Sequence, residues 1–508
     1  DILANLWVNS DEIPNNGIDD DQNGYVDDVH GYDFVNRDGD PNDDHSHGSN
    51  VAGIIAMQGN NNIGLTGACW HCKILTGKNL NANNSGQYSH WAQSVIYAVN
   101  QGAMIINMSE GGSGTSSALR DAMLYAWEAD VPAFISMMNT NNSRRFYPAA
   151  YPSTIAVGAT DVNDHRANPF SWGGGSNFGS HIDISAPGNL IYSMTRYSNR
   201  YNYYYSGTSQ AAPLAAGLAG LLLSIEPNLT AQQIQQLIIR GAEDQVGVEG
   251  EDIEGWDIYH GHGRINFYES LQFLIDQDGD GVSSFLGDCD DQDASLNLND
   301  EDQDGYTTCA LPTCYTLQMN DSGGNGWYQG FLTVNIDQFW SYRLFAAETE
   351  TNYEICVPAG AMMELVYTSG SSENENTYSL LDVDGTVLYS DGPNPVTGIT
   401  FSVVAPIGAI DCDDQNANRF PLNTEICDDI DNDCDLMIDD EDDDLDLETA
   451  YIFFYDEDQD GYGNTTINQQ TCIQPENYTD NDGDCDDQNA NRFPGNLEIC
   501  DGIDNDCN

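Results

Sequence analysis

Short apolar segments alternate with segments of helical periodicity over the first 274 residues of the chain. In the longer segments apolar residues recur every three or four positions, as on one face of a helix, whereas the short segments are apolar throughout, as in buried strands. This alternation predicts an α/β fold with a doubly wound parallel sheet covered by helices on both faces. The predicted strands span residues 73–80, 103–109, 132–137, 151–159 and 182–185, and the predicted helices span residues 47–57, 89–102, 116–127 and 230–241.

Local signals mark the ends of these helices. Ser89 and Ser116 stand where N-caps are expected, and Thr230 and Gln233 have the spacing of a capping box. The apolar run 211–225 is shorter than the roughly 18 residues of a membrane span, contains a proline and is rich in Ala and Gly. We therefore expect it to be a buried helix and the chain to have no membrane span. Residues 1–45 are expected to be loops.

The pattern changes after residue 274. Aromatic and β-branched residues between polar turns predict a small antiparallel β-sandwich over residues 313–405. The segments on either side of it are acidic and poor in apolar residues, so ions and disulfides would have to hold their shape; a disordered acidic tail is the alternative. The sequence thus predicts four domains, 1–274, 275–312, 313–405 and 406–508.

Charge is strongly negative and unevenly distributed. The chain has 14 basic and 82 acidic residues and a net charge of −68. Of these, 53 acidic but only 3 basic residues follow residue 275. Such a surface makes nucleic acid and anionic membranes unsuitable partners, and its self-repulsion predicts bound cations. We expect a monomer that acts on a peptide or protein substrate.

Cysteine usage indicates an oxidising compartment. Eleven of the 13 cysteines follow residue 280 at regular spacings, which predicts a disulfide framework in a secreted, extracellular protein. The chain has neither an initiator Met nor a signal peptide, so we expect it to begin inside a larger precursor. Cys69 and Cys72 in C-W-H-C are expected to form a local disulfide, because zinc would need further ligands and a thioredoxin-like site its own βαβ unit.

Alternating acidic residues followed by glycine recur along the chain. This order wraps oxygen ligands around calcium, and the alternative for the N-terminal loop is a solvated acidic turn, since the distal Glu of a full EF-hand is missing. Residues 276–309 resemble thrombospondin type 3 calcium repeats, and 412–434 returns almost unchanged as 485–507, which resembles a metal-binding repeat of extracellular bacterial proteins. The predicted calcium ligands are Asp19, Asp21, Asn23, Asp276, Asp278, Asp280, Asp300, Asp302, Asp304, Asp456, Asp458 and Asp460.

Three separated motifs contain candidate catalytic residues. Ser209 lies in Y-S-G-T-S-Q-A-A-P and is the candidate nucleophile, His47 heads the helix H-G-S-N-V-A-G, and Asn139 follows a predicted strand. A serine needs a base to take its proton and donors for the oxyanion. With the blocks I-I-N-M-S-E-G-G, D-I-S-A-P-G and G-H-G-R-I-N in order, residues 1–270 resemble the subtilisin family of serine peptidases.

The resemblance implies a role for each of these residues. His47 would be the general base, and the Asn139 side chain and the Ser209 N–H would donate to the oxyanion. Ser109, Glu110 and Gly111 would line the substrate as an added strand. The position of Glu110 is usually occupied by an apolar residue in the family. Glu110 could favour basic or polar substrate side chains, or it could be an exposed residue at the rim without such a role.

The sequence also departs from the family pattern. Met138 stands where a Gly usually precedes the oxyanion Asn, Asn50 replaces a second His, and Gln210 replaces a Met. No I-D-T-G-type strand with the triad Asp is present, and we expect it upstream. The sequence therefore favours a secreted, calcium-stabilised serine endopeptidase; the alternative is a non-catalytic adhesion or matrix protein with a decayed peptidase domain.

Overall fold

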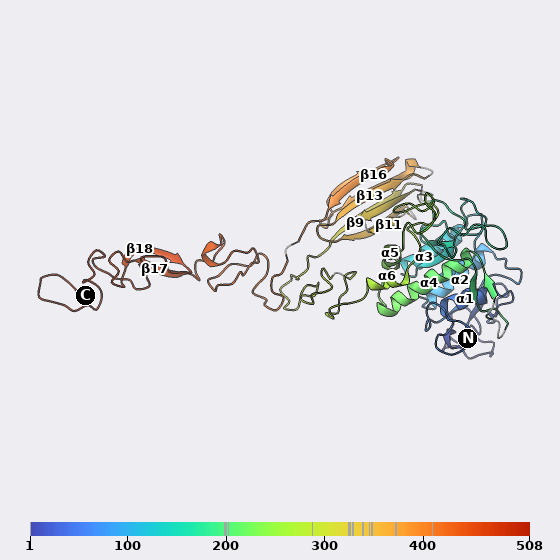
Figure 1. Cartoon of the computed structure of the whole chain (residues 1–508), viewed down its shortest axis with the longest axis horizontal. Coiled ribbons are helices and arrows are strands. Elements are labelled where there is room, and N and C mark those ends of the chain that lie inside the picture. Colours follow the sequence, from blue (N-terminus) through green and yellow to red (C-terminus); the bar gives the residue numbers. More distant parts are fainter. Residues whose placement is uncertain are drawn as a thin grey trace. The chain divides into compact units, whose positions relative to one another are not determined.

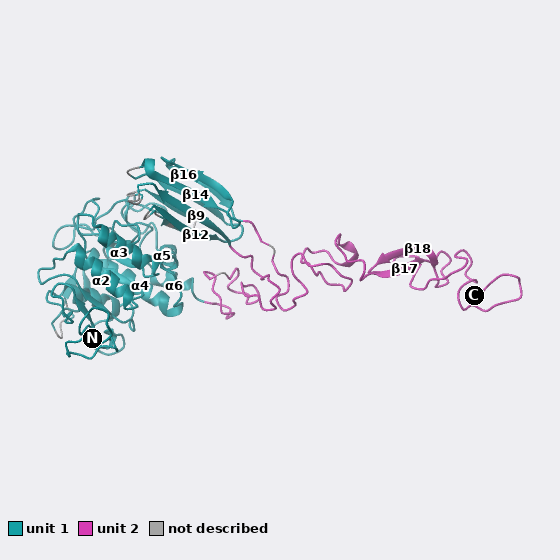
Figure 2. Cartoon of the chain, turned by 180° about the vertical axis from the view of Figure 1, so that it is seen from behind, with its two compact units in different colours: residues 1–275, 313–405 teal, residues 276–312, 406–508 magenta. Residues whose placement is uncertain are grey.

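The computed structural model describes residues 2–197, 201, 203–286, 288–323, 327, 330–337, 340–344, 346, 349–370, 373–408 and 410–508 (Figure 1). The chain divides into two compact units. One unit comprises residues 1–275 and 313–405, and the other comprises residues 276–312 and 406–508 (Figure 2). This division into two units does not test the four domains expected from the sequence, and their boundaries remain predictions.

A four-stranded parallel sheet forms the centre of the first unit, which confirms the α/β class. Its order is β3 (Ile106–Met108), β4 (Ala133–Ser136), β5 (Ile155–Thr160) and β6 (Ile184–Pro187). β4 and β5 are buried at every position, as expected for strands covered on both faces. A separate parallel pair joins β1 (Gly31–Asp33) to β2 (Thr76–Lys78). The expectation that residues 1–45 are all loop is therefore wrong at β1, which is too short to show a pattern.

Helices pack against these strands. The helices are α1 (His47–Ala56), α2 (Tyr88–Asn100), α3 (Ser117–Glu128), α4 (Thr208–Ile225), α5 (Ala231–Arg240) and α6 (Phe267–Gln272). Ser116 caps α3 and the capping box of Thr230 and Gln233 is formed, as predicted. Ser89 is not the cap of α2, because the helix begins at Tyr88 and its N-cap residue is Gln87, which makes no side-chain cap.

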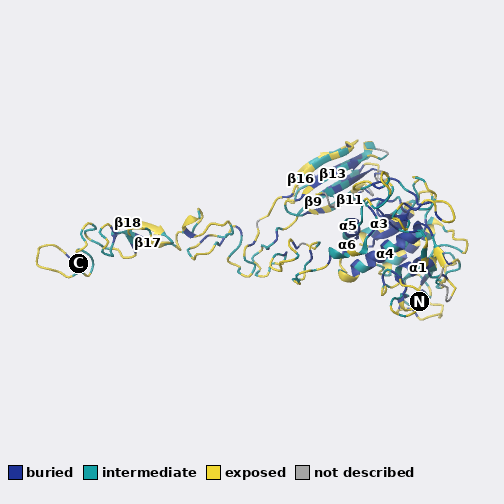
Figure 3. Ribbon diagram, viewed as in Figure 1, coloured by how far each residue is buried: buried dark blue, intermediate teal, exposed yellow. Residues whose placement is uncertain are grey.

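The long apolar helix α4 is a core element. It contacts all four strands of the central sheet and also α1. Its 18 residues are long and apolar enough to cross a membrane by length and composition alone, but 78% of them are buried in the protein (Figure 3). The ribbon of β7 (Ile191–Ser193) and β8 (Tyr203–Tyr205) leads into its N-terminus. The predicted buried helix is confirmed.

Residues 313–405 form the predicted antiparallel sandwich. The sheets have the orders β12-β9-β14-β15 and β11-β10-β13-β16, and Cys314 and Cys356 form a disulfide. Residues 324–326 of the turn before Trp327 lie outside the described residues. The strands are β9 (Thr313–Asp321), β10 (Phe331–Ile336), β11 (Trp340–Leu344), β12 (Glu350–Val357), β13 (Met362–Thr368), β14 (Asn376–Leu381), β15 (Val387–Asp391) and β16 (Gly398–Val404).

Arg343 of β11 joins the sandwich to the α/β domain within the first unit. Its guanidinium donates to the carbonyl oxygen of Ser180 at 2.8 Å and lies 4.3 Å from the ring centroid of Trp256. Burial raises the pKa of the nearby Asp183 to about 6, and the positive charge of Arg343 opposes that rise. A charged side chain held by an aromatic ring and a carbonyl fixes the contact more specifically than apolar packing alone.

The second unit has little regular structure. Its strands β17 (Tyr451–Tyr455), β18 (Asn464–Thr471) and β19 (Tyr478–Thr479) form one small sheet. Four disulfides link its described residues: Cys289–Cys309, Cys412–Cys434, Cys427–Cys472 and Cys485–Cys507. Cys412–Cys434 and Cys485–Cys507 occupy equivalent places in the two sequence repeats, so the repeat in sequence is also a repeat in structure.

Candidate active site

Ser209 lies in the first turn of α4, where the chain turns sharply from β8 into the helix. Its hydroxyl donates to the carbonyl oxygen of Ser109 at 3.2 Å, and the Ser109 hydroxyl donates to the carbonyl oxygen of Ser209 at 2.9 Å. The N-cap is Gly207, where an added Cβ would lie only 3.2 Å from the amide nitrogen of Asn139. The small residues of this motif therefore let Asn139 approach the N-terminus of α4 closely.

Asn139 is fixed by the helix that carries Ser209. Its Oδ1 accepts from the backbone N–H of Thr208 at 2.8 Å and from the Thr208 hydroxyl at 3.0 Å. Because both contacts use the oxygen, the Nδ2 group remains as the hydrogen-bond donor of this side chain. The preceding residue, Met138, has φ of 72°, in the left-handed region that favours glycine. The departure from glycine at this position therefore places a strained residue beside the amide.

His47 is the first residue of α1, and Asp43 holds the loop before it. The carboxylate of Asp43 accepts from the backbone N–H of Ser46 at 2.8 Å and from both the N–H and the hydroxyl of Ser49, at 2.7 and 2.6 Å. Those hydrogen bonds lower the pKa of Asp43 despite the opposing effect of burial. Asp43 is therefore occupied in capping the helix and does not orient the imidazole.

The imidazole of His47 is neutral in this environment. Burial first, and the charge of His45 second, lower its pKa to about 4, although Asp43 raises it. Among the described residues, the ring of His47 donates no hydrogen bond to a carboxylate. A neutral imidazole can accept a proton, but nothing in the described part of the chain selects its tautomer.

Two departures from the family pattern contact each other. Gln210 donates through Nε2 to Oδ1 of Asn50 at 3.0 Å, and both side chains are almost completely buried. The carbonyl oxygen of Asn50 also accepts from the hydroxyl of Ser193 at 2.8 Å. This pair ties α1, which begins with His47, to α4, which carries Ser209. The two substitutions are therefore complementary in the folded protein.

The segment Ser109, Glu110 and Gly111 follows β3, next to the nucleophile. Glu110 is not exposed at a rim: it is buried, and its Oε1 accepts from Asn79 at 2.9 Å. Burial raises its pKa to about 8, against the effect of the Asn79 hydrogen bond. At Gly111, an added Cβ would lie 3.0 Å from the sulfur of Met138. The Met138 side chain thus packs against the Ser109–Gly111 segment.

A large cavity separates the two parallel sheets. Its volume is about 1510 Å³, and β2 and β3 line it along edges that have no strand partner within the described residues. Apolar side chains of three helices line it as well, including Val51, Val95 and Leu223, and His47 lies at its wall. The cavity is therefore bounded by two unpaired strand edges and by helices from both sides.

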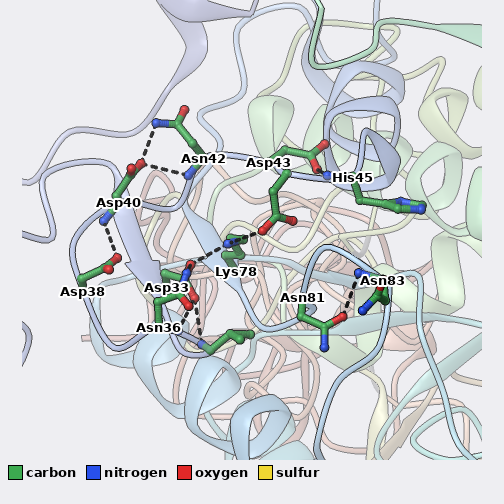
Figure 4. A network of polar contacts seen from close by, with 12 residues as sticks. Asp33, Asn36, Asp38, Asp40, Asn42, Asp43, His45, Lys78, Asn81 and Asn83 are labelled. Carbon is green, nitrogen blue, oxygen red and sulfur yellow. Dashed lines mark hydrogen bonds and ion pairs between the residues drawn. The ribbon is translucent and has the colours of Figure 1, made fainter.

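The C-terminal end of β2 is held at the wall of this cavity by charge pairing. The Nζ atom of Lys78 lies 2.6 Å from Asp33, at the end of β1 (Figure 4). It also lies 3.2 Å from Asp44. These carboxylates raise the pKa of Lys78, although burial lowers it. Asp33 and Asp44 are thereby paired with the cationic side chain of Lys78.

Known proteins are similar to this chain in sequence. The model of the subtilase family matches residues 8–263. The chain is 38% identical over 246 residues to the thermophilic serine proteinase of Bacillus sp. (strain AK1), covering 48% of this chain and 57% of that protein, and 36% identical to thermitase of Thermoactinomyces vulgaris, covering 48% and 81%. The chain belongs to the subtilase family.

A crystal structure of a cold-adapted subtilisin-like serine proteinase is also similar to this subtilase. It is 31% identical, with a TM-score of 0.39, over 46% of this chain and 78% of that one. A model of a metal-binding motif matches residues 411–440 and 484–508. The chain spans 57% of the length of the thermophilic serine proteinase that it matches. The two copies of the C-terminal repeat thus match the metal-binding repeat family that the sequence resembles.

The N-terminal acidic loop of this subtilase has a candidate ligand that the sequence pattern missed. Carboxylate oxygens of Glu12, Asp19 and Asp21 lie within 4.8 Å of one another. Glu12 is buried, and burial raises its pKa. Asn23 donates to Asp21 at 2.9 Å and its backbone N–H donates to Asp19 at 3.0 Å. In the EF-hand pattern a Glu follows the acidic loop, whereas in this fold Glu12 precedes the loop and lies beside Asp19 and Asp21.

The C-terminal acidic loops also gain partners that spacing did not reveal. Each D-x-D-x-D-G loop meets a D-C-D-D segment: the backbone N–H of Gln277 donates to Asp291, that of Glu301 to Asp414, and that of Glu457 to Asp487. Five carboxylates therefore gather at each loop where the sequence predicted three. The recurring D-C-D-D itself was the signal that could have identified them.

Proposed function

We propose that this subtilase is a secreted, calcium-stabilised serine endopeptidase with Ser209 as nucleophile and His47 as general base. The observation that supports this most directly is the convergence of Ser209, Asn139 and the Ser109–Gly111 segment at the N-terminus of α4. Convergence of a nucleophile, an oxyanion donor and an extended segment for a peptide is what acyl transfer requires.

In the proposed reaction, His47 takes the proton of Ser209 as its oxygen attacks the scissile carbonyl carbon. The oxyanion then accepts hydrogen bonds from the Asn139 amide and the Ser209 N–H, and loss of such an amide costs about 2.7–4 kcal/mol in another member of the family. The imidazolium next protonates the leaving amine, which releases it, and water repeats the sequence on the acyl-enzyme. The low pKa of His47, about 4, keeps its imidazole available as a base at neutral pH.

The triad carboxylate would come from a strand that fills the cavity between β2 and β3. Strands lie about 4.8 Å from their neighbours, rise about 3.3 Å per residue and pack about 10 Å from a covering layer, so each residue needs roughly 160 Å³. The cavity volume of about 1510 Å³ thus has room for roughly nine residues of strand. Such a strand would pair with the free edges of β2 and β3 and would run next to His47, which lies at the wall of the cavity.

Calcium would be held in this domain by Glu12, Asp19 and Asp21, with Asn23 closing the loop. Their oxygens lie close enough together for one ion, and calcium accepts six to eight oxygen ligands in flexible geometry. The ion would stabilise the loop by offsetting the repulsion of buried carboxylates. The disulfides support an extracellular location, since such bonds persist in oxidising compartments.

A serine-directed phosphonate tests the nucleophile. A version of the chain extended upstream through an I-D-T-G-type strand should be labelled and should hydrolyse peptides, and Ser209→Ala should abolish both. Ser224→Ala, on the exposed face of the same helix, is the matched control and should retain both. Undiminished labelling of the Ser209→Ala variant would overturn the assignment of the nucleophile to Ser209, whereas an unlabelled and inactive parent would favour the non-catalytic alternative.

Comparison with residues 1–508 alone tests the strand. Without the carboxylate, this shorter chain should hydrolyse peptides weakly or not at all, because the loss of a triad Asp costs about 10⁴ in kcat in a serine peptidase of another fold. Equal activity of the two versions would show that a carboxylate within residues 1–508 orients His47, and that the cavity has another occupant.

A further inference from the structure

Two acidic loops of the second unit make the same contacts. For one of them, a whole domain lies in the sequence between the loop and the segment that it contacts. In the loop at residues 456–461, the N–H of Glu457 donates to Asp487 at 3.0 Å, across 30 residues. In the loop at residues 300–305, the N–H of Glu301 donates to Asp414 at 2.9 Å, across 113 residues. The difference in separation is the β-sandwich 313–405, which belongs to the other unit (Figure 2).

The contacts around the two loops match in detail. Tyr306 stacks on Phe420 with centroids 5.6 Å apart and planes at 14°, and Tyr462 stacks on Phe493 at 5.5 Å and 11°. The N–H of Asp411 also donates to the carbonyl oxygen of Thr307 at 2.9 Å. Residues 300–308 and 411–420 therefore form one module whose halves lie on either side of the sandwich in the sequence.

Buried carboxylate oxygens without partners point into this module. Asp411 is 3% exposed, and its Oδ2 has no hydrogen-bond partner among the described residues; Oδ2 of Asp302 and of Asp304 is in the same state. Burial and the negative charges of Asp304, Asp302 and Asp414 raise the pKa of Asp411, so these groups face one another. The same three positions are without partners in the other two loops, at Asp278, Asp280 and Asp288 and at Asp458, Asp460 and Asp484.

Three buried anionic oxygens that converge without donors are strongly destabilising unless a cation binds them. A set made only of carboxylates suits a hard divalent cation, and the flexible coordination of calcium suits several carboxylates from two separate segments. Asp300 is partly engaged, because its oxygens accept from the N–H groups of Gln303 and Gly305. Asp302, Asp304 and Asp411 are therefore the main ligands, with Asp300 and Asp414 beside them.

We propose that Asp302, Asp304 and Asp411 form a single calcium site that spans the inserted β-sandwich. The ion joins the chain segment that leaves the second unit to the segment that returns to it. Closing a loop of this length has a large entropic cost, and the acidic segments repel each other, so the ion is what keeps the two halves together. This inference does not depend on peptidase activity.

Calcium titration with hydrogen–deuterium exchange tests the shared site. In a Ser209→Ala background that prevents self-cleavage, chelated protein should gain protection on calcium addition both in 301–307 and in 411–416. Asp411→Asn should lose that gain in both segments and remove one tight site from the calorimetric stoichiometry, while 457–462 and 484–488 stay protected. Asp484→Asn should lose the protection of 457–462 and 484–488 and keep that of 301–307 and 411–416. Asp443→Asn, at an exposed position, should behave as the parent.

Asp302→Asn gives the decisive comparison, because it changes the half before the sandwich. It should abolish the calcium-dependent protection of 411–416, more than 100 residues away in sequence, and lower the affinity of one site at least tenfold. If Asp302→Asn and Asp411→Asn each affect only their own segment, the site is not shared and the proposal fails. Unchanged stoichiometry in both variants, or protection produced by magnesium and not by calcium, would overturn it equally.

Discussion

Replacement of Glu110 by Gln should change how stability depends on pH. Glu110 is buried beside the nucleophile, and burial raises its pKa from 4.5 to about 8. A carboxyl whose pKa is raised on folding stabilises the fold fully below its unfolded pKa, and this contribution is lost as the pH rises through the folded value. The shift corresponds to a loss of roughly 3–5 kcal/mol between about pH 4.5 and pH 8. Gln is neutral throughout, keeps an acceptor for Asn79 and has no such loss.

Urea unfolding at several pH values between 4.5 and 8.5 measures this effect. The Ser209→Ala background prevents self-cleavage, and calcium is held constant. The difference in unfolding free energy between Glu110→Gln and its parent should grow in favour of Gln by roughly 3–5 kcal/mol over this range. Groups that both proteins share, such as His47, cancel in that difference. Glu128→Gln, at an exposed position of α3, is the control and should track the parent.

A constant difference between Glu110→Gln and its parent at all pH values would refute this reasoning. It would show that Glu110 is already ionised in the folded protein at neutral pH, with a cation or water stabilising its charge. The carboxylate would then be available to a basic substrate side chain, which is one of the two roles considered from the sequence.

Three further changes test other contacts. Met138→Gly should be about 1 kcal/mol more stable than Met138→Ala in thermal unfolding, because only glycine is unstrained at a φ of 72°; equal stability would contradict the strain. Asn50→Ala and Gln210→Ala should each cost about 1–3 kcal/mol, and the double variant less than their sum, since each single change leaves one buried amide unpaired; additivity would argue against the pair. Arg343→Met should raise the protease sensitivity of residues 313–405 and lower the unfolding midpoint, and no change would remove its role in docking the sandwich.

Periodicity and composition predicted most of the fold. The helices α1, α3 and α5 lie where the sequence placed them, because each has an apolar face and the last two have clear N-terminal caps. The sandwich and the local disulfide Cys69–Cys72 are also confirmed. The three-residue strand β1 was missed, because it is too short for a pattern and its pairing depends on β2, more than 40 residues away.

The candidate ligands that sequence reasoning missed lie outside the acidic loops that they join. Glu12 precedes its loop in the sequence, and Asp411 reaches Asp302 and Asp304 across an inserted domain. Spacing rules describe ligands within one short loop, so they are blind to a ligand that folding supplies from elsewhere. The burial of Glu110 had no sequence signal either, since a carboxylate is normally exposed and here a single amide satisfies it.

Around Ser209, the contacts between residues 47–210 are formed, whereas the hydrogen bond between Ser209 and His47 is not. Asn139 is held by Thr208, and Asn50 by Gln210, through partners within residues 47–210. The hydroxyl of Ser209, by contrast, donates to a backbone carbonyl and not to His47. In the proposed enzyme, a strand that enters the cavity between β2 and β3 would join the two sheets and orient His47 in one step. Burial of the strand would then stabilise the domain and also place the carboxylate beside His47. A fully folded domain would therefore always contain the triad carboxylate.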